Sequence, residues 1–213
     1  MALPAEKDDL RRYMRELRGE LAARDPDAAE RLASIFPMKL LERYGPAVAG
    51  YIPIGSEMDP RPLMARLEKA GAQLCLPRVD DCGERMSFRL WSSGEPLEDR
   101  PFGLKEPHEE APLAAPTLVL APLLAFDERG QRLGYGKGHY DRALETLRDQ
   151  GPVFVCGVAY HRQLIDAVPS EPHDQMLDWA ITEEGSVPLF MMRGLRTRAD
   201  GDGTPDNNGP GAA

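Results

Sequence analysis

Short apolar runs alternate along this sequence with segments of helical periodicity, and this alternation strongly limits the folds that the chain can adopt. The runs at residues 47–53 (AVAGYIP), 117–122 (TLVLAP) and 153–160 are largely apolar at consecutive positions, as expected of strands buried on both faces. Strands that alternate with helices are typical of a parallel sheet covered by helices. We therefore predict an α/β fold: a single three-layer domain with a mostly parallel central sheet flanked by helices. In such sheets, ligands bind beyond the carboxyl ends of the strands.

Helices are predicted where apolar residues recur at spacings of three and four, or where proline and glycine mark the ends. In the first, residues 7–23, this spacing puts Leu10, Met14, Leu17 and Leu21 on one face. Residues 95–116 are rich in proline, glycine and acidic residues, which indicates a long loop. The other predicted elements are helix 27–36, strand 47–53, helix 62–70, strands 73–79, 86–91 and 117–122, helix 139–150, and strands 153–160 and 179–182.

The C-terminal residues 194–213 (GLRTRADGDGTPDNNGPGAA) contain almost no apolar side chains. A segment of this composition cannot bury enough apolar surface to offset the entropy lost on folding. We therefore predict one domain at residues 1–193 and a disordered C-terminal tail at residues 194–213.

The chain is acidic, with a formal net charge of −9. This balance argues against nucleic acid or an acidic membrane as a general partner, so an anionic ligand would need a local cluster of lysine and arginine. No apolar run approaches the roughly 20 residues of a membrane span, and residues 1–12 do not resemble a signal peptide. We expect a cytoplasmic protein with no membrane partner, and its three cysteines reduced.

A glycine-rich segment at residues 127–138 precedes the predicted helix 139–150. Gly134, Gly136 and Gly138 occupy alternate positions, and Arg132 and Lys137 add positive charge. Glycine lets the backbone approach a phosphate closely, and a helix N-terminus that follows favours negative charge. The segment lacks the G-x-x-x-x-G-K-[ST] pattern, and a simple mobile glycine turn is the alternative interpretation.

Two further charged features accompany this loop. Asp141 falls in the first turn of the helix, where it either interacts with the helix dipole or, beside phosphate, holds a magnesium ion. On the first helix, the basic residues Lys7, Arg11, Arg15 and Arg18 share one face, and the charge pattern alone indicates a solvated surface.

The run FDxxGxRLGYGxGxYDR at residues 126–142 closely resembles the signature of the 5-formyltetrahydrofolate cyclo-ligases, also called methenyltetrahydrofolate synthetases. Other segments resemble this family in the expected order over about residues 7–183. His139 stands where the family more often has tyrosine. The matching residues outside the signature are Lys7, Leu10 and Arg11; Tyr51, Ile52, Pro53 and Glu57; Phe102, Gly103, Leu104, Glu106 and Pro107; and Gln163, Pro169, His173 and Asp174.

This resemblance implies ATP-dependent cyclisation of 5-formyltetrahydrofolate to 5,10-methenyltetrahydrofolate, with release of ADP and phosphate. The formyl oxygen would be phosphorylated to give an iminium phosphate, which nitrogen-10 then attacks. The implied partners are small molecules, a reduced folate and ATP, with Mg²⁺ as cofactor, and the protein is expected to be a monomer or weak homodimer.

The resemblance also implies a role for each matching residue. Arg132, Lys137 and Tyr140 would be catalytic, and Asp141 and Asp174 would bind the metal. Ile52 and Glu57 would contact the folate pterin, with residues 135–139 bordering its formyl end. This reassigns Lys7 and Arg11 to phosphate binding and leaves Arg15 and Arg18 on the solvated face. The implied ATP-binding residues are Lys7, Arg11, Arg132, Leu133, Gly134, Tyr135, Gly136, Lys137, Gly138, His139 and Tyr140.

Two other functions are compatible with the same pattern. One is another α/β enzyme with a phosphate loop, such as a sugar-phosphate isomerase or CoA transferase, because fold alone does not determine function. The other is a non-catalytic folate- or nucleotide-binding protein. A requirement for ATP would separate the first from the cyclo-ligase, because an isomerase needs none. The presence of Lys7, Arg11, Glu57, Asp141 and Asp174 argues against the second, because a sensor need not keep two metal-binding carboxylates.

Overall fold

The computed structural model describes residues 3–4, 6–80 and 82–189, so the predicted tail, residues 194–213, lies outside the described residues. Within them, the main sheet has eight strands: β1 (Ala47–Ala49), β2 (Gln73–Val79), β3 (Met86–Leu90), β6 (Leu113–Ala114), β7 (Leu118–Pro122), β10 (Phe154–Val158), β11 (Trp179–Thr182) and β12 (Gly185–Val187). Their order is β12-β11-β10-β7-β1-β2-β3-β6. The strands from β11 to β2 are parallel, and β12, β3 and β6 extend the edges in antiparallel pairing.

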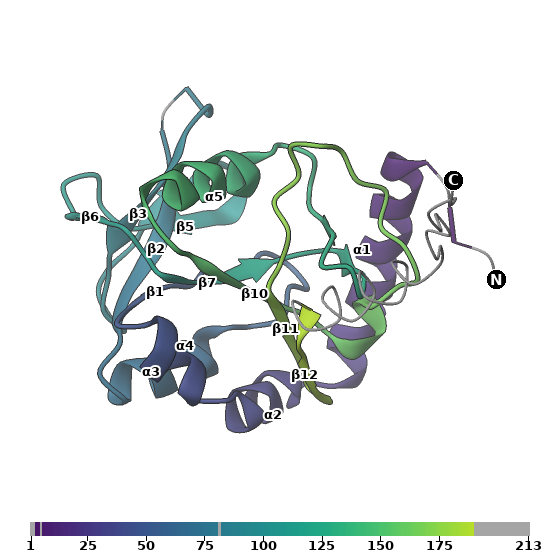
Figure 1. Ribbon diagram of the computed structural model, residues 1–213, viewed down its shortest axis with the longest axis horizontal. Coiled ribbons are helices and arrows are strands. Elements are labelled where there is room, and N and C mark those ends of the chain that lie inside the picture. The colour runs from purple at the N-terminus through teal and green to yellow at the C-terminus, as the bar shows by residue number, and fades with distance from the viewer. Residues whose placement is uncertain (1–2, 5, 81, 190–213) are drawn as a thin grey trace, which may run out of the picture.

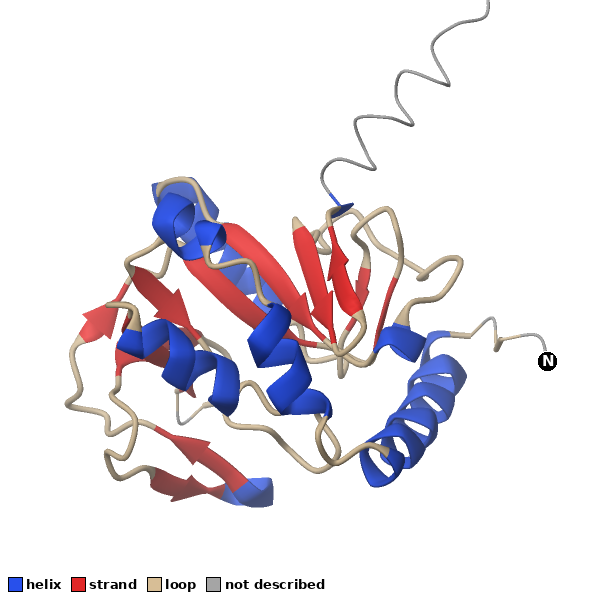
Figure 2. Ribbon diagram, turned by 90° about the horizontal axis from the view of Figure 1, so that it is seen from below, coloured by secondary structure: helices blue, strands red, loops and turns tan. Residues whose placement is uncertain are grey.

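Helices cover both faces of this sheet, as Figures 1 and 2 show. The helices α2 (Ala28–Ile35), α3 (Lys39–Tyr44) and α4 (Arg61–Lys69) lie against one face, and α5 (His139–Gln150) lies against the other. The longest helix, α1 (Lys7–Arg24), lies toward the end of the molecule where the carboxyl ends of the strands point. Short 3₁₀ turns occur at Pro101–Gly103 and His161–Gln163. The predicted three-layer α/β fold is confirmed.

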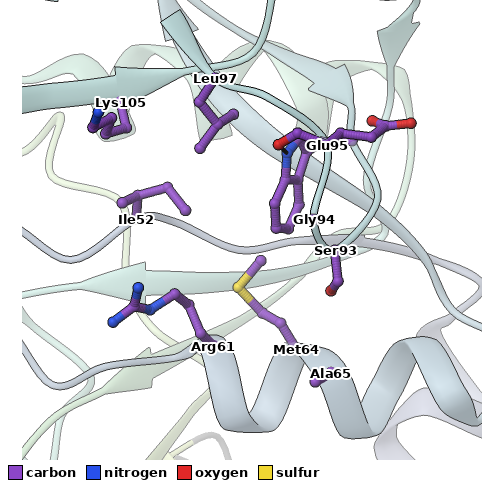
Figure 3. A pocket seen from close by; sticks show the side chains of 10 residues that line it. Ile52, Arg61, Met64, Ala65, Ser93, Gly94, Glu95, Leu97 and Lys105 are labelled. Atoms are coloured by element: carbon purple, nitrogen blue, oxygen red, sulfur yellow. Dashed lines mark hydrogen bonds between the residues drawn. The ribbon is translucent and has the colours of Figure 1, made fainter. Parts of the chain in front are cut away.

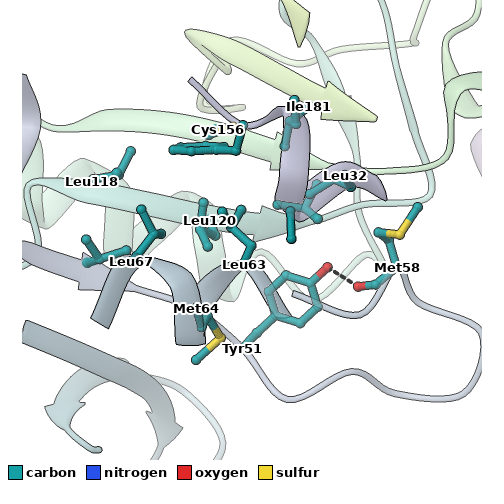
Figure 4. Close-up of a cluster of buried hydrophobic side chains, with 14 of the residues drawn as sticks. Leu32, Tyr51, Met58, Leu63, Met64, Leu67, Leu118, Leu120, Cys156 and Ile181 are labelled. Atoms are coloured by element: carbon teal, nitrogen blue, oxygen red, sulfur yellow. Dashed lines mark hydrogen bonds between the residues drawn. The ribbon is translucent and has the colours of Figure 1, made fainter. Parts of the chain in front are cut away.

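The central strand β7 shows how the sequence builds two cores. Its alternate residues Leu118 and Leu120 pack with α2 and α4, whereas Val119 and Ala121 pack with α5. Figure 4 shows the first cluster, in which the Tyr51 hydroxyl donates a 2.6 Å hydrogen bond to the backbone oxygen of Met58. Each large apolar side chain buried in this way contributes about 1.5–3 kcal/mol, so both helical layers are needed for stability.

The chain leaves the sheet earlier than its apolar pattern predicts, since β1 ends at Ala49 and not at residue 53. Beyond it the backbone enters a tight turn, in which the Ile54 amide donates to the Glu57 carboxylate and the Glu57 amide donates to the Ile54 carbonyl. Gly55, with φ of +59°, permits this turn. The early end of β1 therefore places Glu57 beyond the carboxyl end of a central strand.

The predicted long loop at residues 95–116 is only partly irregular. It contains a two-stranded ribbon of β4 (Glu98–Arg100) and β5 (Leu104–Glu106), and then the edge strand β6. A second ribbon, β8 (Ala125–Phe126) with β9 (Arg132–Leu133), lies within the segment that leads into the glycine loop. These strands are only two or three residues long, too short to show an alternation of apolar and polar residues, so periodicity did not reveal them. Among the described residues, no helix is long and apolar enough to cross a membrane.

Gly130, at the turn between β8 and β9, provides a test of this packing. Its φ is +85°, and a Cβ atom there would lie 2.6 Å from the backbone oxygen of Leu177. We predict that Gly130→Ala lowers the free energy of unfolding by about 2–5 kcal/mol, because backbone strain and a clash with rigid backbone add together. Urea denaturation measures this loss.

Gly71→Ala is the matched control. Gly71 also has a positive φ, +97°, but nothing lies within 4 Å of the position of its Cβ. Its substitution should cost only about 1–2 kcal/mol, the strain term alone. Equal losses for both variants would show that the contact with Leu177 does not constrain the turn.

Candidate active site

Helix α1 brings Arg11 to the glycine loop and Lys7 to the segment around Asp174. Both segments lie more than a hundred positions further along the chain. The Arg11 Nε donates a 3.1 Å hydrogen bond to the backbone oxygen of Gly134. A Cβ atom on Gly136 would lie 3.2 Å from the guanidinium carbon of Arg11, so a larger residue there would crowd this contact. One turn earlier on the helix, the Lys7 ammonium lies 2.7 Å from Glu171 Oε1 and 3.5 Å from Asp174 Oδ2.

A second ion pair lies where the glycine loop enters α5. Arg132 Nη2 donates a 2.6 Å hydrogen bond to Asp141 Oδ1, which also accepts a 3.0 Å bond from the Gln175 amide. The Arg132 side chain is only 4% exposed, and its Nη1 is buried with no hydrogen-bond partner among the described residues. A buried guanidinium with an unmatched donor is suited to bind an anion.

The two predicted metal-binding carboxylates belong to neighbouring segments. The amide that bonds to Asp141 belongs to Gln175, the residue directly after Asp174. No cluster of three or more His, Cys, Asp or Glu side chains able to hold a metal occurs in the described part of the chain. A magnesium ion needs only one or two carboxylates when substrate phosphates and water supply its other ligands. The donors present therefore fit magnesium bound together with phosphate.

Tyr135 connects the glycine loop to the turn that carries Glu57. Its hydroxyl donates to Glu57 Oε1 and accepts a 2.6 Å hydrogen bond from Arg18 Nη1. Arg18 Nε also donates to Ser56 Oγ at 3.2 Å. The prediction that Arg18 lies on the solvated face of α1 is therefore wrong, since this residue is 3% exposed. The charge pattern could not reveal this, because the partners of Arg18 come from distant segments. Arg15 is exposed, as predicted.

Burial raises the pKa of Glu57, while the hydrogen bonds from Tyr135 and the Ile54 amide and the charge of Arg18 lower it. The net direction is upward. Burial is also the main cause of the raised pKa of Tyr140, whose hydroxyl is buried without a hydrogen-bond partner among the described residues. Tyr140 therefore stays protonated and can donate a hydrogen bond. The guanidinium carbon of Arg132 lies 5.6 Å from the centroid of the Tyr140 ring.

The remaining residues of the predicted ATP loop differ in accessibility. Gly136 and Lys137 are exposed, whereas the Leu133 side chain is buried against α1, so only its backbone can face a ligand. His139 Nε2 lies 3.1 Å from the backbone oxygen of Gly83, at the turn between β2 and β3. Its pKa is lowered by burial and by the nearby charge of Arg142. Gly138, with φ of +66°, directs the chain into α5.

A pocket of about 580 Å³ adjoins the turn after β1 (Figure 3). Ile52 lines it, together with the apolar side chains of Met64, Trp91 and Leu97. Arg61 and Lys105 place two cations at its wall, where they are paired with Asp59 and Asp99. The sequence did not single out Trp91, Arg61 or Lys105. Trp91 directly follows β3 and Lys105 lies in β5, and no motif marks either residue.

A parallel α/β sheet with cations and carboxylates paired around a glycine loop at its carboxyl edge is typical of an enzyme that binds a phosphate-bearing ligand. The chain belongs to the 5-formyltetrahydrofolate cyclo-ligase family, whose model matches residues 4–183. The activity of this family is the ATP-dependent cyclisation of 5-formyltetrahydrofolate. The predicted family and enzyme class are thereby confirmed.

Individual relatives agree with this assignment. The chain is 34% identical to the 5-formyltetrahydrofolate cyclo-ligase of Mycolicibacterium smegmatis, over 67% of this chain and 76% of that protein. It is 27% identical to the enzyme of the same name from Haemophilus influenzae, over 87% and 95% of the two chains. The structure resembles the 5,10-methenyltetrahydrofolate synthetase of Aquifex aeolicus with a TM-score of 0.69 and 29% identity, covering 86% of this chain and 92% of that one.

The two ion pairs of the site should differ in their effect on stability. We predict that Asp141→Asn lowers the free energy of unfolding by about 1.5–3 kcal/mol, because it removes the charge opposite buried Arg132. Asp174→Asn should cost less than about 1 kcal/mol, because its partner Lys7 is 25% exposed and solvent screens the pair. In both variants the amide oxygen can still accept the backbone hydrogen bond. Chemical denaturation of both compares them, and an equal loss would show that Arg132 does not depend on Asp141.

Proposed function

We propose that this protein closes the ring of 5-formyltetrahydrofolate at the glycine loop, with ATP phosphates on one side of the loop and folate on the other. The observation that carries the proposal is the position of Tyr135. It follows Gly134, which Arg11 contacts, and its hydroxyl is bonded to Glu57 on the turn after β1. A phosphoryl donor and its acceptor must meet, and this loop is bonded to the elements of both predicted sites.

On the phosphate side, Lys7, Arg11, Arg132 and Lys137 are proposed to bind the triphosphate. Gly134, Gly136 and Gly138 would allow its close approach to the backbone, and residues 139–140 begin the helix that follows. Asp141 and Asp174 would hold Mg²⁺, which supplies neutralisation of phosphate charge when bound. The buried, unmatched Nη1 of Arg132 supports an anionic ligand here.

On the folate side, Glu57 is proposed to accept hydrogen bonds from the ring N–H and amino group of the pterin. A carboxylate matches such an adjacent pair of donors. Ile52 lies just before the turn that carries Glu57 and lines the pocket of Figure 3. Trp91, which also lines this pocket, offers an aromatic surface. Arg61 and Lys105 would lie near the carboxylates of the folate glutamate. An apolar pocket with positive charge at its wall suits a ligand that is aromatic and anionic.

The chemistry requires activation of a poor leaving group, the formamide oxygen. Transfer of the γ-phosphoryl group to this oxygen gives an iminium phosphate; nitrogen-10 attacks that carbon, and phosphate leaves as the ring closes. No covalent enzyme intermediate is needed. Arg132 and Lys137 would stabilise charge on the transferring phosphoryl group, and Tyr140, kept protonated by burial, would donate a hydrogen bond. We further propose that the acidic chain acts in the cytoplasm, as a monomer or weak homodimer, on small molecules alone.

The direct test mixes purified protein, 5-formyltetrahydrofolate, ATP and magnesium. The ultraviolet absorbance of the methenyl product should rise, and ADP and phosphate should appear in equal amounts. Omission of ATP should abolish the reaction. Product formation without ATP, or ATP hydrolysis without folate turnover, would contradict the proposal.

The phosphate role of α1 gives a separate prediction. We expect Lys7→Ala and Arg11→Ala to raise the KM for ATP by about 10- to 150-fold, the value of a charge-assisted contact of roughly 1.5–3 kcal/mol. The KM for folate should change less. Arg12→Ala is the control, because Arg12 is exposed and pairs with Asp9 on its own helix. Steady-state kinetics with varied ATP at saturating folate measures the effect. Equal, small effects in all three variants would remove α1 from the ATP site.

The magnesium role of the two carboxylates is tested in the same assay. Asp141→Asn and Asp174→Asn should each lower turnover and raise the magnesium concentration needed for half-maximal rate by at least about tenfold, since even outer-shell partners of a metal contribute this much. If a folded variant retains wild-type turnover at limiting magnesium, the residue that it replaces is not a magnesium ligand.

A further inference from the structure

Arg18 is a buried cation in a position of α1 where an apolar residue would be simpler to accommodate. Leu10, Met14 and Leu21 on the same helix are buried and apolar, and Arg18 is buried with them. Removing a guanidinium from water costs several kcal/mol unless its donors find partners. Arg18 finds three: the Tyr135 hydroxyl at 2.6 Å, Ser56 Oγ at 3.2 Å, and the charge of Glu57, with 3.8 Å between Nη1 and Oε1.

The direction of these hydrogen bonds follows from their chemistry. A guanidinium only donates, so the Tyr135 oxygen must accept from Arg18. The single hydrogen of the tyrosine hydroxyl is then directed to Glu57 Oε1. The other carboxylate oxygen, Oε2, accepts from the Ile54 amide at 2.9 Å. The chain of bonds from Arg18 through Tyr135 to Glu57 therefore fixes the rotation of both side chains.

We propose that Arg18 is a positioning residue that locks Tyr135 to Glu57, so that the glycine loop and the folate-binding acid form one unit. The inference rests on the proposed function, in which Glu57 binds the pterin and Tyr135 belongs to the ATP loop. Its consequence is coupling between the two substrates. Folate bound at Glu57 orders the loop that binds ATP phosphates, because a shift of Glu57 moves Tyr135 with it.

Contacts around the loop support this role. The guanidinium carbon of Arg18 lies 5.6 Å from the centroid of the Tyr135 ring, within cation–π range. Tyr135 is itself 40% exposed, and the two residues after it are exposed. Its hydroxyl bonds are thus major anchors of this part of the loop, together with the bond from Arg11 to Gly134.

The charge of Arg18 also acts on Glu57. The titratable groups that face this carboxyl are Arg18 from α1, Tyr135 from the loop, Tyr51 beyond β1 and Tyr140 from α5. Among these, only Arg18 is a cation. Burial raises the pKa of Glu57 and Arg18 opposes this rise. Loss of Arg18 would raise the pKa of Glu57 further. When the pH is lowered, the Glu57 carboxylate would then become protonated, and lose its capacity to accept hydrogen bonds from folate, at a higher pH than in the wild type.

The test compares Arg18→Met, which removes charge and donors but keeps an unbranched apolar chain, with Arg18→Lys, which keeps the charge but replaces the planar fork of donors with a single ammonium group. Arg12→Met on the exposed face is the matched control. In Arg18→Met the KM for 5-formyltetrahydrofolate should rise by about 10- to 150-fold. As the pH is lowered, this KM should also begin to increase at a higher pH in Arg18→Met than in the wild type. Arg18→Lys should restore the pH profile but only part of the affinity. A folded Arg18→Met with unchanged folate KM and pH profile would overturn the proposal.

A second measurement separates this inference from the proposed function. Backbone amide hydrogen exchange at residues 134–138, without ligands, should be faster in Arg18→Met than in Arg12→Met. This result does not depend on catalysis, so it would stand even if the methenyl assay failed, and unchanged exchange would count against the link. If Arg18→Met does not fold, Tyr135→Phe replaces it in both measurements. The loss of this one hydroxyl should give the same faster exchange and a raised KM for folate. Wild-type exchange together with a wild-type KM for folate would refute the proposal.

Discussion

The contact between α1 and the segment around the β8–β9 ribbon determines the geometry of the whole site. Leu10 and Met14 on α1 are buried in one apolar cluster with Leu124, Ala125 and Leu133. Burial of apolar surface is not directional, but close packing of these side chains fixes the position of the helix. With the helix held in this way, Arg11 and Arg18 contact Gly134 and Tyr135 of the loop, and Lys7 contacts Glu171 and Asp174. The electrostatics of the site depends on this apolar packing, because the same charges on a detached helix would be solvated.

Two residues that match the family, Asp127 in the signature and Gln163 outside it, stabilise the structure around the glycine loop. Asp127 is fully buried, and its carboxylate accepts hydrogen bonds from the amides of Arg129, Gln131 and Val168. Gln163 donates to the backbone oxygens of Leu123 and Leu124 at 3.0 and 2.9 Å. These bonds satisfy backbone groups that leave the sheet, which would otherwise be buried without partners. They hold the ends of the glycine loop on a rigid base and leave residues 135–137 exposed to a ligand.

Sequence reasoning was most accurate where local signals are complete. The helix predicted at 139–150 was found with those bounds, because Gly138 and Gly151 delimit it. The strand after Gly71 was also placed correctly. Burial of Arg18 and the pocket around Trp91 could not be predicted, since each depends on contacts between segments far apart in the sequence. The family resemblance named candidate residues but not their partners, so the pairing of Lys7 with Asp174 and of Arg132 with Asp141 emerged only from the structure.

That pairing explains how so many charges can gather in a partly buried site. Cations of the phosphate side have carboxylate neighbours: Lys7 has Asp174 and Glu171, Arg11 has Asp8, and Arg132 has Asp141. A cluster with little net charge costs less to desolvate than one with a single sign. In the proposed reaction, these cations would bind the phosphates of ATP, and Asp141 and Asp174 would hold the magnesium that neutralises phosphate charge. The pairing keeps the local charge nearly balanced, which lets the site be formed before the substrate arrives.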